Sequence, residues 1–182
     1  HERQEATRWL PFVDGYGNRL GHYNESSVSL QLRYAPGEKF YQTKTHRIPV
    51  NLDAPVFQLT HTLAFKGFAG SRFDINKTEL SVGKRFWLSA FGYIDAIISG
   101  GHVWSRSPYL NLLIPNANLS YTIQPESFAL MNPMEFINDS YAQWDLTYWA
   151  NGLLFNQIPF VKKAKLREVV SFRGLYGHLS RR

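Results

Sequence analysis

The sequence predicts an all-β protein, an antiparallel meander that forms part of a transmembrane β-barrel, and three observations lead to this fold class. Short segments in which apolar and polar residues alternate recur along the 182 residues. Several of them are about 10–13 residues long, nearer to a tilted membrane strand than to the ~5–6 residues of a usual globular strand. The chain also has no cysteine, and it has no apolar run near the ~20 residues of a membrane-spanning helix.

Composition supports one domain, residues 1–182, with a buried surface but without disulfides. Hydrophobic residues make up 44% of the chain and aromatic residues 15%, which makes wholesale disorder unlikely on physical grounds. The net charge is +6, yet the basic residues gather in a turn instead of alternating with aromatics on one platform, so we expect no nucleic-acid partner. The chain begins at His1 and shows no signal peptide, so we expect it to be processed or to be part of a longer protein.

The first strands are expected in the N-terminal half. Residues 28–34 alternate strictly and end at a Pro-Gly turn at residues 36–38, which predicts a strand. Residues 40–47 are predicted to return beside it as a polar hairpin. After a break with two prolines, apolar residues recur in 57–65 on one face, and His61 interrupts them.

Two longer strands are expected next. Residues 73–87 are β-prone, but their apolar parity shifts between Ile75 and Leu80, which predicts a β-bulge. Residues 91–103 form another predicted strand, with Ile94, Ala96 and Ile98 on one face and Asp95 and Ser99 on the other.

The segment 105–140 has four prolines and no clean period, although it is rich in apolar residues. Long segments of this kind in compact domains are usually functional or fold back onto the protein. We therefore expect one long ordered loop, packed on or in the barrel.

The C-terminal part returns to strands. Residues 141–151 alternate most clearly, residues 156–165 are predicted to form a lysine-rich turn, and residues 166–178 form the last strand. The sequence thus predicts about seven strands and no convincing helix. Because bacterial single-chain membrane barrels have even strand numbers, the chain is predicted to be an incomplete barrel.

Alternation assigns a face to many residues of such a barrel. Aromatic residues near the predicted strand ends would form interfacial girdles: Tyr34, Phe65, Phe86, Trp87, Trp104, Tyr141 and Trp149. The predicted lipid-facing residues are Trp144, Leu146, Tyr148, Val170 and Phe172. The predicted lumen charges, which we expect to form ion pairs that hold the barrel and its loop, are Arg33, Asp95, Asp145, Arg167 and Arg173.

Specific motifs in the C-terminal third carry a family resemblance. They are residues 128–132 (FALMN), 135–139 (EFIND), 151–156 (NGLLFN), Ile158-Pro159 and 165–169 (KLREV), and residues 32–40 (LRYAPGEKF) fit more loosely. With these motifs the chain resembles a family of Bacteroidota outer-membrane proteins of unassigned function. That family has a carboxypeptidase-regulatory-like N-terminal domain and a C-terminal barrel similar to those of the BamA-like surface-antigen superfamily.

The resemblance implies a barrel fragment in the outer membrane of a Gram-negative cell. The family's barrel has about sixteen strands, and its final aromatic strand and regulatory-like domain have no counterpart here. The resemblance further implies that the long loop faces outside and the turn at 156–165 faces the periplasm. We expect a non-enzymatic role in envelope biogenesis or outer-membrane transport, with membrane lipid as a partner and periplasmic or outer-membrane proteins as candidate partners.

Three groups of residues were considered for chemistry. His178 and Ser180 would share a strand face, as a nucleophile and its base do in outer-membrane phospholipases, but no third group to orient the imidazole can be named. The six histidines lack ligand spacing, so no metal is expected, and scattered glycines predict no phosphate-binding loop or cofactor. Glu135, Asp139 and Asp145 could form an acidic site, although lumen ion pairs explain such charges more simply.

Two alternatives stay open. The first is a soluble or periplasmic antiparallel β-barrel that binds an apolar ligand, in which the aromatic face would line the interior. The second is an outer-membrane esterase that uses His178 and Ser180. The three lysines at 162, 163 and 165 either contact anionic headgroups or a periplasmic partner, or keep a solvated turn soluble.

Overall fold

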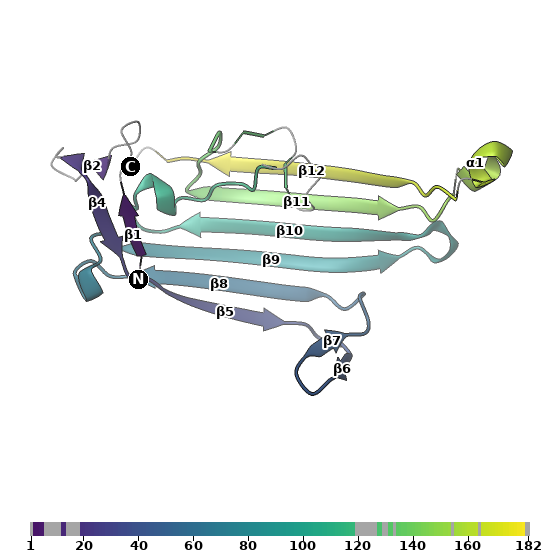
Figure 1. The fold of residues 1–182 in the computed structure, drawn as a ribbon, viewed down its shortest axis with the longest axis horizontal. Coiled ribbons are helices and arrows are strands. Elements are labelled where there is room, and N and C mark those ends of the chain that lie inside the picture. Colours follow the sequence, from purple (N-terminus) through teal and green to yellow (C-terminus); the bar gives the residue numbers. More distant parts are fainter. Residues whose placement is uncertain are drawn as a thin grey trace.

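The fold is all-β and is dominated by one antiparallel sheet (Figure 1). The computed structural model describes residues 2–5, 12–13, 19–118, 127–128, 131–132, 134–153, 155–163 and 165–180. The sheet has six strands in the order β12-β11-β10-β9-β8-β5. Their bounds are β5 Val28–Tyr34, β8 Val56–Ala64, β9 Ile75–Trp87, β10 Tyr93–Val103, β11 Ser140–Trp149 and β12 Val169–His178.

The register of the sheet places the alternating apolar residues of all six strands on one face. Leu32 pairs with Leu59, and Leu59 pairs with Leu80. Farther along the sheet, Ile98 pairs with Trp144. Since partners in adjacent strands point to the same side of a sheet, these pairs define an apolar face, and the residues between them define a polar face. The amphipathic strands and the antiparallel meander that the sequence predicts are therefore present.

The predicted hairpin of residues 40–47 against the first strand is wrong. β6 (Phe40–Gln42) pairs with β7 (Arg47–Pro49) in a separate two-stranded ribbon, whereas β5 pairs with β8. The Asn51 side chain closes the base of this ribbon, because it accepts the Lys39 N–H at 2.6 Å and donates to the Gly37 carbonyl at 3.0 Å. The ribbon is thus an insertion between β5 and β8.

The predicted β-bulge in residues 73–87 is also wrong. β9 pairs residue for residue with β8 over Ile75–Gly83 and with β10 over Lys77–Trp87. The shift in apolar parity arises because Ile75 points to the polar face, where it is buried at the end of the strand. Leu80 points to the apolar face, so both residues fit one regular strand.

The remaining elements are short. The N-terminal strands form two ribbons, β1 (Glu2–Glu5) with β4 (His22–Glu25) and β2 (Phe12–Val13) with β3 (Arg19–Leu20). Among the described residues, four 3-10 turns occur at η1 Phe68–Gly70, η2 Ser89–Phe91, η3 Tyr109–Asn111 and η4 Phe155–Gln157. The predicted lysine-rich turn contains one short helix, α1 (Pro159–Lys163), which lies beyond the end of the sheet in Figure 1. No helix among the described residues has the length and apolar character needed to cross a membrane.

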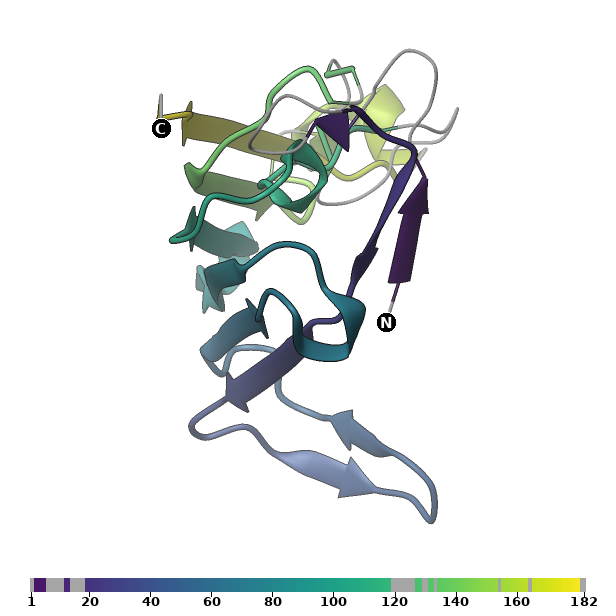
Figure 2. The same cartoon turned by 90° about the vertical axis from the view of Figure 1, so that its left-hand side faces the viewer.

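The long loop folds back over the polar face of the sheet. Two bridges, Leu113 with Asn138 and Ala117 with Phe128, give its described residues an ordered path. Leu113 is buried and packs against the sheet, since a Cβ added at Gly101 would lie 3.2 Å from Leu113 Cδ1. Figure 2 shows the loop and the N-terminal strands on the same side of the sheet. Residues 119–126, 129–130 and 133 of the loop lie outside the described residues.

Candidate functional site: the polar face and its cavity

The polar face carries charged side chains that pair with one another across adjacent strands. Arg85 Nε lies 2.6 Å from Asp95 Oδ1, and its Nη2 lies 2.9 Å from Asp95 Oδ2. The two residues are direct partners in β9 and β10. This bidentate geometry is the strong form of an arginine–carboxylate pair.

A second ion pair connects the sheet to the loop. Asp145 in β11 faces Arg173 in β12, and Arg173 Nε lies 2.7 Å from Asp145 Oδ2. Asp145 is only 7% exposed, so its charge would be costly without this partner. Arg173 also donates from Nη1 to the carbonyl of Ser127 in the loop at 3.0 Å. The pair therefore holds a described part of the loop against the polar face.

Of the five predicted lumen charges, four lie on the polar face and one does not. Arg33 lies there at the sheet edge and makes a bidentate pair with Glu38, at 2.6 and 2.8 Å. The hydrogen bond from Arg33 holds the pKa of Glu38 below its ordinary value. Arg167 is exposed and lies outside the sheet. It belongs to the connection between α1 and β12, and β12 begins only at Val169.

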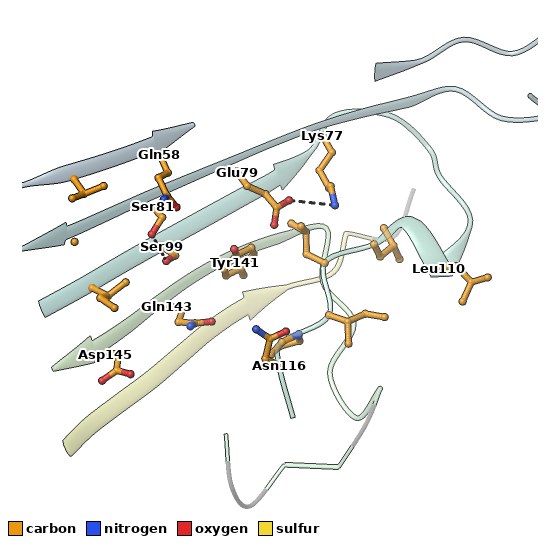
Figure 3. Close-up of a pocket in the computed structure, with 17 residues that line it drawn as sticks. Gln58, Lys77, Glu79, Ser81, Ser99, Leu110, Asn116, Tyr141, Gln143 and Asp145 are labelled. Carbon is orange, nitrogen blue, oxygen red and sulfur yellow. Dashed lines mark hydrogen bonds and ion pairs between the residues drawn. The ribbon is translucent and has the colours of Figure 1, made fainter. Parts of the chain in front are cut away.

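The loop and the polar face bound a half-open cavity of about 590 Å³. Its floor is formed by polar residues of β8, β9, β10 and β11, and its roof by residues 110–116 of the loop (Figure 3). The labelled floor residues in Figure 3 are Gln58, Lys77, Glu79, Ser81, Ser99, Tyr141, Gln143 and Asp145. Lys77 Nζ lies 3.2 Å from Glu79 Oε2, and Ser81 Oγ lies 3.1 Å from Ser99 Oγ.

The opposite face presents its apolar side chains to the outside. All five predicted lipid-facing residues (Trp144, Leu146, Tyr148, Val170 and Phe172) share this face. Val170 is 61% exposed and Phe172 is 62% exposed. Trp144 lies across Gly174 of β12, where an added Cβ would come within 2.1 Å of Trp144 Cζ2. Gly174 thus provides the space for the indole ring.

The predicted aromatic girdle divides between the two faces. Tyr34 and Phe86 lie on the apolar face, but Trp87, Tyr141 and Trp149 lie on the polar face. The ring centroids of Trp87 and Trp149 lie 5.0 and 5.9 Å from that of Tyr93, and the Arg85 guanidinium lies 4.1 Å from the Tyr93 centroid. Period-two parity within each strand could have indicated this placement, because these residues share the parity of the polar side chains.

Histidine and hydroxyl side chains form a polar row at one end of the apolar face. The row contains His61, Thr78, His102, Ser140 and His178 in consecutive strands. His61 Nδ1 lies 2.9 Å from Thr78 Oγ1, and His102 Nδ1 lies 2.7 Å from Ser140 Oγ. Trp104 Nε1 donates to Thr78 Oγ1 at 3.0 Å. In β9 to β12 this row ends the apolar band of the sheet, whereas Leu63 in β8 and Val28 in β5 extend the band beyond His61.

His178 and Ser180 do not form the arrangement of a nucleophile and its base. The Ser180 hydroxyl donates to the Asp139 carboxylate, and the Ser180 N–H donates to Asp139 Oδ2 at 2.9 Å. The hydrogen bond from the Ser180 hydroxyl, together with those from the Ser180 N–H and the Ser140 hydroxyl, holds the pKa of Asp139 below its ordinary value. Asp139 therefore ties the end of β12 to the start of β11, a contact that the sequence analysis missed.

The three carboxylates considered as an acidic site have different partners. Glu135 accepts the Asn132 N–H at 2.8 Å, whereas Asp139 binds Ser180 and Asp145 binds Arg173. Within the part of the chain that the structure describes, no group of three or more histidines and carboxylates could hold a metal ion. His1 lies outside that part.

Fold and site together define a protein built on an amphipathic antiparallel sheet, with a polar cavity on one face and an exposed apolar face on the other. The chain belongs to the family of unknown function (DUF5686), as its C-terminal domain, whose family model matches residues 11–181. No curated protein and no solved structure matched the chain.

Proposed function

We propose that this chain is a segment of an outer-membrane β-barrel without enzymatic activity, which serves envelope biogenesis or the passage of material across the outer membrane. One observation carries the proposal: the apolar side chains of the sheet gather on one face and are exposed there. They come from all six strands and are Val28, Leu30, Leu32, Tyr34, Phe57, Leu59, Leu80, Phe86, Ile98, Leu146, Val170, Phe172 and Tyr176.

The size of this surface supports lipid as its environment. Soluble monomers rarely expose contiguous apolar patches above a few hundred Å². A lipid environment makes the same surface favourable, since a membrane barrel presents an apolar band to the bilayer and a polar interior. A strand of 10 residues, the length of β11 and β12, rises roughly 33 Å and at a tilt of about 45° spans roughly 23 Å. This span is close to the ~25 Å height of the apolar band in such barrels.

The opposite face supports a lumen. It carries the pairs Arg85–Asp95 and Asp145–Arg173, and the loop packs on it through Leu113 and the Arg173–Ser127 hydrogen bond. A soluble barrel with an apolar ligand would place its cavity and its covering loop on the other face. The Bacteroidota origin and the similarity to BamA-like barrels are part of this proposal and rest on the sequence resemblance.

The proposal is tested by extraction of the full-length protein from native membranes. We expect it to stay in the membrane pellet after an alkaline carbonate wash and to dissolve only in detergent, because a spanning sheet is held by its apolar band. A peripheral protein of the same host serves as the control for release. Release of the full-length protein by the wash, without detergent, would reject the membrane proposal and favour the soluble alternative.

A further inference from the structure

We propose that the cavity between the polar face and residues 110–116 binds a neutral, hydroxyl-rich ligand of the saccharide class. The inference rests on the proposed function, because it names what the lumen-facing cavity of the barrel would take up. The cavity's volume of about 590 Å³ lies within the ~300–1,000 Å³ of typical ligand pockets.

The charges of the cavity are internally compensated. Three charged residues line it, namely Lys77, Glu79 and Asp145. Lys77 and Glu79 pair with each other at 3.2 Å, and Asp145 pairs with Arg173 at 2.7 Å. A charged ligand would have to break one of these pairs or bind without a counter-charge from the lining. This arrangement disfavours ionic ligands.

Neutral hydrogen-bonding groups are instead available in the cavity. The side-chain amides of Gln58, Gln143 and Asn116 line it from β8, from β11 and from the loop. Among the described residues, no hydrogen bond occupies these three amides. Figure 3 shows Gln143 and Asn116 approaching the same space from the sheet and from the loop. Each amide both donates and accepts hydrogen bonds, which matches hydroxyl groups, since they also do both.

The roof of the cavity and the Tyr141 ring on its floor supply the apolar part of the site. Leu110, Leu112, Ile114 and Pro115 line the loop side, and the Tyr141 ring lines the floor. A sugar ring has hydroxyl groups at its rim and C–H groups on its faces. Amides on both the sheet side and the loop side, together with the aliphatic loop side chains and the Tyr141 ring, fit this distribution, because in typical ligand pockets a few polar groups orient an otherwise apolar contact.

The test uses the fluorescently labelled full-length protein in detergent on an array of immobilised neutral and acidic oligosaccharides. We expect retention on neutral members in preference to acidic ones. Titration calorimetry with the tightest neutral oligosaccharide then compares two variants, Gln143→Leu in the cavity and Gln31→Leu, which lies on the same polar face in β5 outside the cavity lining. Gln143→Leu should weaken binding at least tenfold, whereas Gln31→Leu should leave it unchanged.

Three outcomes would overturn the inference: no oligosaccharide retained, preference for acidic ones, or equal effects of the two variants. If Gln143→Leu does not fold, as judged by its thermal unfolding, Asn116→Ala on the exposed loop replaces it in the same comparison. The result is separable from the membrane proposal. A protein that resists the alkaline wash but binds no oligosaccharide contradicts only the saccharide inference, and a protein that binds but is released by the wash contradicts only the membrane proposal.

Discussion

The two faces of the sheet differ in which side chains they expose and which they bury, although the same strands form both faces. On the apolar face, side chains such as Phe172 and Val170 are exposed, whereas on the polar face Asp145 is buried beside Arg173. Exposed apolar side chains beside a buried charge are unfavourable in water, because apolar burial is the main favourable term in folding, and the proposed lipid environment would remove this cost. Because both faces have the same secondary structure, the stability of the sheet depends on what surrounds each face.

The largest expected effect comes from placing an arginine on the apolar face of β12, in comparison with an arginine on its polar face. Phe172→Arg should lower the unfolding free energy in lipid vesicles by about 2–4 kcal/mol, because a charge on the lipid face of a barrel is costly near the midplane. Ser171→Arg, one residue away on the polar face, should cost less than about 1 kcal/mol. Urea titration of the two variants measures the difference. Equal costs would show that the faces do not differ in their surroundings.

The second effect tests the polar face through its buried ion pair. Arg173→Leu should cost roughly 2–3 kcal/mol in the same titration, since it leaves the buried Asp145 carboxylate without its charged partner and with only the hydrogen bond from the Thr147 hydroxyl. The double variant Asp145→Asn with Arg173→Leu should recover part of this loss, because no buried charge remains. If the double variant is less stable by the sum of the single effects, the two side chains do not act as a pair.

The third effect tests close packing on the apolar face. Gly174→Ala should cost about 1–3 kcal/mol, because its Cβ would overlap the Trp144 ring and force it to move. In a Trp144→Ala background the same substitution should cost under about 0.5 kcal/mol. The unfolding free energies of the four proteins form the measurement. A full cost in the Trp144→Ala background would assign the effect to the backbone at residue 174 and not to the ring.

The smallest effect concerns Asp139, where the loop joins β11. Its pKa is lowered in the folded protein by the hydrogen bonds from Ser180 and Ser140. The folded state therefore gains stability from the carboxylate above the unfolded pKa of about 3.9, and this gain is lost as the pH falls through the lower folded pKa. Asp139→Asn should reduce stability by about 1 kcal/mol near pH 7. The difference in unfolding free energy between this variant and the unsubstituted protein should shrink below about pH 4. A difference independent of pH would contradict this assignment.

Strands could be predicted from sequence where their cause is local. The alternation in residues 28–34, 91–103 and 141–151 depends on neighbours two positions apart. The first two segments contain the strands that the structure shows, and the third covers all of its strand except Ser140. The prediction of a loop at 105–140 also depends on local features, namely its prolines and its lack of period. The faces of Trp144 and Phe172 follow from the same parity.

Partners across strands could not be predicted in the same way. Residues 40–47 were paired with the wrong strand, because the Asn51 side chain that closes their ribbon lies outside the predicted hairpin. Arg85 was missed as the partner of Asp95, and Asp139 as the partner of Ser180, since both pairs depend on register or on contacts distant in sequence. Gln58, Gln143 and Asn116 carry no motif, and they share a cavity only because the loop folds over the sheet.

The sequence by itself determined the all-β class, the positions of the main strands along the chain and the division of these strands into an apolar and a polar side, because these follow from side-chain alternation along a continuous backbone. The tertiary structure alone decided which strands are neighbours, on which face the loop lies and which charges are paired. These features depend on register between strands up to dozens of residues apart. A shift of one residue in that register would turn every side chain of a strand to the other face.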